Sequence, residues 1–176
     1  MRQVSKGQRQ AAVGVHISVL LLVLCLSTSR ANGQARFVSF GPDQPIPSGF
    51  KTYSLFLIPS SEWLGRSEEL LELHGAFQSF GDAIGDDHLA VWFRGADREL
   101  MSTDSLNRCK SYCDRFGLDY SGGPYVVVSD VNPDGEDAGG MEPVVIKLDR
   151  VKTSGIIRIL NILEKDLRTR AFSGMI

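Results

Sequence analysis

Short apolar runs alternate with longer amphipathic stretches from residue 52 onward, and this alternation is the feature that most constrains the fold. The runs are rich in aromatic and β-branched residues and end at proline or charged residues, a pattern typical of buried strands. The stretches between them place apolar residues at steps of three and four, which indicates helices with one apolar face. We therefore predict strands over residues 52–58, 88–93, 124–129 and 143–148, and helices within residues 60–85, 103–117 and 153–170.

Capping residues set the expected helix ends. Ser67, which two glutamates follow, is predicted to cap the first helix, and either Thr103 or Ser105 the second. Gly117 is predicted to end the second helix, and Thr153 to cap the third.

The order of these elements predicts one mixed sheet. Strands separated by a helix are expected to run parallel, whereas the last two, joined only by residues 130–142, are expected to form an antiparallel hairpin. This predicts a four-stranded sheet with helices on both faces. The proline- and glycine-rich residues 34–51 are expected to form an extended lead-in, in which residues 37–40 could add a short edge strand. Residues 171–176 are expected to be a C-terminal tail.

The first 33 residues have the pattern of a secretory signal peptide. Four basic residues and no acidic residue occur there, an apolar run spans residues 11–27, and small residues precede Gln34, where cleavage is expected. The run is near the lower length limit for crossing a bilayer, so a retained membrane anchor is the alternative. Both interpretations place the body of the protein outside the cytoplasm, in a periplasmic or extracellular compartment.

Charge limits the classes of partner. The chain holds 19 basic and 21 acidic residues, and four of the basic ones lie in the leader, so the body is acidic. An acidic body argues against binding to nucleic acid or to anionic lipid, both of which need clustered Lys and Arg. We expect a protein or peptide partner, no nucleic acid, no cofactor, and membrane contact only through an uncleaved N-terminal segment.

The element order and the residues from Phe116 to Val127 resemble the thioredoxin fold. In that family a helix ends at a glycine, a short loop follows, and a cis-proline opens the next strand. Gly117 and the Gly123-Pro124 pair are similar in spacing, and the resemblance covers residues 52–168. It implies a thioredoxin-like β-α-β-α-β-β-α domain over residues 52–170, with a cis peptide bond before Pro124.

The sequence departs from the redox members of that family at the place of their Cys-x-x-Cys motif. Residues 58–64 read Ile-Pro-Ser-Ser-Glu-Trp-Leu, without a cysteine, and a serine hydroxyl cannot replace a thiolate of lowered pKa. No histidine lies nearby to activate the serines, so we expect them to have turn or capping roles. The main hypothesis is therefore a non-catalytic protein- or peptide-binding module, whose surface comprises Pro59, Ser60, Ser61, Trp63, Pro124 and Tyr125.

Cys109 and Cys113 carry the alternative hypothesis, a thiol-disulfide oxidoreductase. They lie four residues apart and so share one helix face, at a separation compatible with a disulfide but with poorly directed Cβ atoms. Both also belong to the apolar stripe of the second predicted helix, where buried cysteines commonly pack as small hydrophobic residues. The packing interpretation is favoured.

Residues 130–135 carry a third hypothesis, a calcium-stabilised exported domain. Asp130, Asn132 and Asp134 match the opening of a calcium-binding loop. Glu142 comes one place later than the loop requires, and turn residues in a hairpin have the same composition. The primary expectation is that no metal binds.

Overall fold

The computed structural model describes residues 37–136 and 142–173. The predicted leader, residues 34–36 of the lead-in and residues 174–176 of the expected tail lie outside the described residues, whereas residues 171–173 of that tail belong to the last helix. The strands are β1 (Phe37–Phe40), β2 (Thr52–Leu57), β3 (His88–Phe93), β4 (Tyr125–Ser129) and β5 (Val144–Lys147). The α-helices are α2 (Ser67–Ile84), α3 (Thr103–Phe116) and α4 (Thr153–Ser173), and the short 3-10 helices are η1 (Ser61–Trp63) and η2 (Tyr120–Gly122).

The strands form one five-stranded mixed sheet in the order β1-β3-β2-β4-β5. The parallel β2–β3 pair and the antiparallel β4–β5 hairpin confirm two predictions. The prediction of four strands was wrong, because β1 pairs in parallel with β3 and becomes an edge strand. Aromatic packing holds it there: the Phe37 ring lies edge-on to Phe77 of α2, with 6.0 Å between ring centroids.

β4 runs antiparallel to β2, although it follows a helix and a parallel direction was expected. Its first residue, Tyr125, pairs with Leu57, the last residue of β2, so the chain enters β4 at the carboxyl end of β2. The chain leaves α3 through Gly117, the predicted stop, whose φ of 64° is a left-handed conformation that glycine adopts without strain. The loop after Gly117 then leads to this edge of the sheet.

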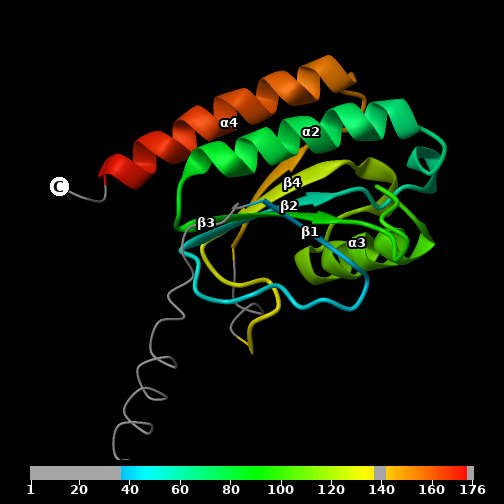
Figure 1. Ribbon diagram of the computed structural model, residues 1–176, viewed down its shortest axis with the longest axis horizontal. Helices are drawn as coiled ribbons and strands as arrows, with labels where there is room; N and C mark the ends of the chain where they lie inside the picture. Colours follow the sequence, from blue (N-terminus) through cyan, green and yellow to red (C-terminus); the bar gives the residue numbers. More distant parts are fainter. Residues whose placement is uncertain (1–36, 137–141, 174–176) are drawn as a thin grey trace, which may run out of the picture. The chain divides into compact units, whose positions relative to one another are not determined.

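Helices cover both faces of the sheet, as predicted. α2 and α4 lie side by side on one face, and α3 lies on the other (Figure 1). Because side chains alternate along a strand, Phe56 and Trp92 pack toward α2 and α4, whereas Leu55 and Val91 pack toward α3. Within the described ranges, none of the helices has the length and apolar content needed to cross a membrane.

All three helix starts differ from the predictions, and α4 begins at Thr153 itself, the residue predicted to be its cap. Ser102 caps α3, and Thr103 is its first helical residue. The Ser102 hydroxyl accepts a hydrogen bond from the Ser105 N–H at 3.3 Å, and the Ser105 hydroxyl accepts one from the Ser102 N–H at 2.7 Å. This reciprocal pair satisfies two donors at once and explains why the cap precedes Thr103. Helix α2 begins at Ser67 itself, after Arg66, which makes no side-chain capping bond.

Arg108 of α3 fastens the lead-in to the domain. Its guanidinium donates hydrogen bonds to the carbonyls of Gly41, Pro42 and Gln44. It also lies over the ring of Phe93, 4.5 Å from the centroid. Part of the expected lead-in is therefore held to α3 by one side chain.

Candidate functional site

The loop between β2 and α2 carries two serine hydroxyl groups, those of Ser60 and Ser61. Ile58 and Pro59 are buried, and Ser61 is exposed. The Ser60 hydroxyl accepts a hydrogen bond from the Glu62 N–H at 3.4 Å and so caps η1. The predicted capping role of Ser60 is confirmed.

Pro59 meets the Gly123-Pro124 pair across this end of the sheet. The Gly123-Pro124 peptide bond is cis, as the resemblance implied. The two segments approach so closely that a Cβ atom on Gly123 would lie 2.5 Å from Cδ of Pro59. The Pro124 carbonyl accepts a hydrogen bond from the Leu148 N–H at 2.8 Å, which brings the segment after β5 to the same edge.

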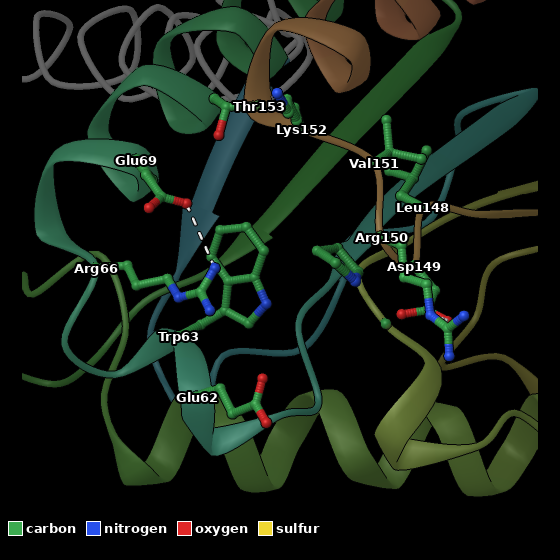
Figure 2. Close-up of a pocket in the computed structure, with 12 residues that line it drawn as sticks. Glu62, Trp63, Arg66, Glu69, Leu148, Asp149, Arg150, Val151, Lys152 and Thr153 are labelled. Atoms are coloured by element: carbon green, nitrogen blue, oxygen red, sulfur yellow. Dashed lines mark ion pairs between the residues drawn. The ribbon is translucent and has the colours of Figure 1, made fainter.

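A pocket of about 500 Å³ opens beside this contact (Figure 2). Three segments surround it: the start of α2 with η1, the Gly123-Pro124 pair, and the turn between β5 and α4. The Trp63 side chain is only 7% exposed and packs into the core, yet it also lines the pocket. The lining residues are Glu62, Trp63, Arg66, Glu69, Gly123, Pro124, Leu148, Asp149, Arg150, Val151, Lys152 and Thr153.

Tyr125 does not reach this pocket. It is 3% exposed and belongs to the core layer that faces α3, where its hydroxyl donates to the Asp119 carbonyl at 2.7 Å. The strand alternation explains this placement, because neighbouring Val126 points to the layer of α2 and α4 instead. Of the predicted surface, Trp63 and Pro124 line the pocket. Pro59 lies against Gly123 beside it, and Ser60, Ser61 and Tyr125 are not part of its lining.

Charged side chains of both signs line the pocket. Arg66 lies 5.0 Å from the Trp63 ring centroid, and its Nη1 atom is 3.6 Å from a carboxylate oxygen of Glu69. Arg150 pairs with its neighbour Asp149 at 3.7 Å. The backbone of Arg150 has a φ of 60°, an uncommon conformation for a residue with a side chain.

The sequence analysis missed the wall formed by residues 148–153. The signal was present in the predicted hairpin, because a strand antiparallel to β4 must end where β4 begins. Lys147 indeed pairs with Tyr125, so the turn after β5 lies beside the Gly123-Pro124 pair. The run Asp149-Arg150-Val151-Lys152 then supplies charges at this edge of the sheet.

Cys109 and Cys113 are free thiols in the core layer under α3, with exposed fractions of 4% and 0%. Burial raises the pKa of Cys109 to about 12, although a backbone hydrogen bond of Ile58 acts in the opposite direction. Burial, followed by the negative charges of Asp114 and Asp119, raises the pKa of Cys113 to about 12. Reactive cysteines need the opposite environment, which argues against the oxidoreductase alternative.

Two of the four residues expected to bind calcium, Asn132 and Asp134, have structural partners instead. Asp134 accepts hydrogen bonds from the Ile46 N–H at 2.7 Å and from the Tyr112 hydroxyl at 2.5 Å. The Asn132 amide oxygen accepts from the Asp134 N–H, and its amide group donates to the Ile46 carbonyl. In the part of the chain that the structure describes, no three His, Cys, Asp or Glu side chains are grouped so that they could hold a metal ion. These contacts argue against the calcium alternative.

A polar pair, His88 and Thr52, lies at the end of β2 and β3 opposite to the pocket. His88 is 2% exposed, its Nδ1 atom is 2.7 Å from Oγ1 of Thr52, and its ring is edge-on to Phe80. Its Nε2 atom has no hydrogen-bond partner among the described residues. Burial lowers the pKa of His88 to about 4, so the ring is neutral at physiological pH. We interpret this group as part of the core.

Comparison of the chain with protein-family models, curated proteins and solved structures gives no match.

Proposed function

We propose that this protein is an exported thioredoxin-like domain without redox chemistry, which binds a segment of another protein or a peptide. The observation that carries the proposal is the pocket between η1, Gly123-Pro124 and the turn before α4. Apolar side chains and charged side chains both line it. In binding sites, apolar groups supply contact area and polar groups fix the orientation of the ligand.

Several features support the thioredoxin-like part of the proposal. A parallel β2–β3 pair is followed by an antiparallel β4–β5 hairpin, and two helices lie on one face with one on the other. Gly123-Pro124 opens β4 and lies against the loop that follows β2. These are the positions that the resemblance implied for the family's motif loop and its proline.

The side chains at the pocket support binding in preference to thiol chemistry. The loop after β2 offers the Ser60 and Ser61 hydroxyls, of which Ser60 already caps η1. Both thiols of the body are buried and have raised pKa values. Disulfide exchange proceeds by attack of a thiolate, so a site with neither a thiolate nor an exposed sulfur has no nucleophile for it.

Export is proposed from the leader, with its basic start, apolar run and small residues before Gln34. The intact mass of the protein recovered from the exported fraction tests this point. Loss of residues 1–33 is expected for a cleaved signal, and a full-length mass in the membrane fraction supports the anchor. Recovery of the full-length chain in the cytoplasm would refute export.

Peptide binding is tested with heptapeptides selected from a random phage library on the folded domain. We expect the selected peptides to shift the amide resonances of pocket residues. A bulky maleimide label on Glu62→Cys, at the pocket, should abolish binding. The same label on Lys165→Cys, on the exposed surface of α4 and outside the pocket, should leave binding unchanged.

Two results would contradict the proposal. The first is selection of peptides that shift resonances elsewhere and are insensitive to the label on Glu62→Cys. The second is that no peptide is selected at all.

A further inference from the structure

We infer that the pocket selects peptide segments that carry two opposite charges, an acidic side chain for Lys152 and a basic side chain for Glu62, on either side of an apolar centre. This inference rests on the proposed function and adds the chemistry of the ligand. It follows from which charged groups at the pocket are already paired and where the unpaired ones lie.

Both arginines of the pocket lining, Arg66 and Arg150, have an ion-pair partner within the protein. Glu69 lies 3.6 Å from Arg66, and Asp149 lies 3.7 Å from Arg150. Arg66 is engaged further by its position over the Trp63 ring. Each arginine therefore brings its own counter-charge to the pocket, and neither leaves a net charge for a ligand to neutralise.

Glu62 and Lys152 are the charged lining residues that remain. Both are exposed, and neither has an ion-pair partner among residues 37–136 and 142–173. They come from different elements, since Glu62 belongs to η1 and Lys152 directly precedes α4. In Figure 2 they lie at opposite ends of the pocket, with Trp63 between them.

Four apolar residues also line the pocket: Trp63, Pro124, Leu148 and Val151. A ligand that follows this pattern has an acidic group, an apolar centre and a basic group, which an extended peptide supplies through side chains along its length. A compact polyanion is disfavoured, because both arginines are already paired with carboxylates and the unpaired Glu62 would repel it.

The expected selectivity is modest for each contact, because ion pairs at an exposed rim are weak. Each charge pair should contribute about threefold in affinity, and the two together about tenfold. Like charges in place of a matched pair should weaken binding by a similar factor. The preference should fall at high salt, since exposed pairs are screened.

The experiment uses blocked synthetic peptides and the folded protein. Each peptide has an apolar centre of two, three or four residues between two terminal charges. The charges are acid then base, base then acid, two acids, or two bases, and affinities are measured by calorimetry at low and high salt. The protein is compared with the double variant Glu62→Lys, Lys152→Glu. The control is Asp97→Lys, Lys165→Glu, which makes the same charge changes at exposed residues outside the pocket.

We expect one opposite-charge order to bind the unmodified protein about tenfold more tightly than either like-charge peptide. The double variant should prefer the reverse order, and the control should keep the original preference. Equal affinities for like and opposite charges, or an unchanged preferred order in the double variant, would overturn the inference and leave peptide binding intact. If none of these peptides and no selected heptapeptide binds, the proposed function itself fails.

Discussion

His88 should make the stability of the fold depend on pH. Its pKa is about 4 in the folded protein, against 6.5 for an exposed histidine, because burial disfavours the charged ring. The neutral ring is therefore favoured in the folded state, and stability from this group is fully present above pH 6.5. Stability is lost as the pH falls from 6.5 toward 4, and the total loss is about 3 kcal/mol.

Between pH 7.5 and pH 5 the same shift predicts a loss of about 2 kcal/mol in the free energy of unfolding. This loss is measured by urea denaturation at the two pH values, followed by circular dichroism. His88→Asn keeps a polar atom near Thr52 Oγ1 but does not titrate. The fall in its free energy of unfolding between the two pH values should therefore be smaller, by about 2 kcal/mol, than that of the unmodified protein. The readout is this difference between pH values, so a uniform destabilisation by the substitution does not affect it.

His74 provides the matched control. It is half-buried on α2, and burial lowers its pKa as well, with no further cause acting on it. His74→Asn should therefore change the pH dependence less than His88→Asn does. Equal losses in the unmodified protein and in His88→Asn would refute the assignment of this effect to His88.

Three further predictions concern packing, thiols and metal binding. Gly81→Ala on α2 should destabilise the fold by about 1–3 kcal/mol, because the new Cβ would lie 2.6 Å from the Cβ of an alanine in β3. Gly75→Ala on the same helix meets no atom and should stabilise the fold by up to about 1 kcal/mol, and thermal denaturation of both variants checks this. Cys109 and Cys113 should remain unmodified by a thiol reagent until denaturant is added. Mass spectrometry measures the labelling, and labelled native protein would contradict their buried placement. The Tm in millimolar calcium should equal the Tm in chelator, and a higher Tm in calcium would support the metal hypothesis. Asp134→Ala should lower the free energy of unfolding by about 1–3 kcal/mol, because two hydrogen bonds are lost.

The core strands and helices could be predicted because their signals are local. Apolar periodicity alone indicated β2, β3 and the buried stripes of the helices. The direction of β4 could not be obtained in this way, because it depends on where the chain leaves α3. The α3 cap was misjudged for a different reason: Ser102, Thr103 and Ser105 all favour caps, and only the reciprocal bonds distinguish between them.

The candidate site was predictable in part. The resemblance predicted that Gly123-Pro124 would face the loop after β2, and the structure brings the two together. Tyr125 was assigned to the same surface because it follows Pro124, but strand alternation turns it to the other face. Lys152 was missed because its importance comes from the position of a turn, not from any motif in its neighbours.

The contacts of Asp134 have a consequence for the order in which the chain can become structured during synthesis. The carboxylate joins Ile46, 88 positions earlier in the sequence, to Tyr112 of α3. Arg108, which donates a hydrogen bond to the Gly41 carbonyl, lies 67 positions after Gly41 in the sequence. Within the lead-in, β1 can pair as soon as β3 has emerged, whereas residues 41–46 acquire these side-chain anchors only after α3 and then residue 134 have emerged.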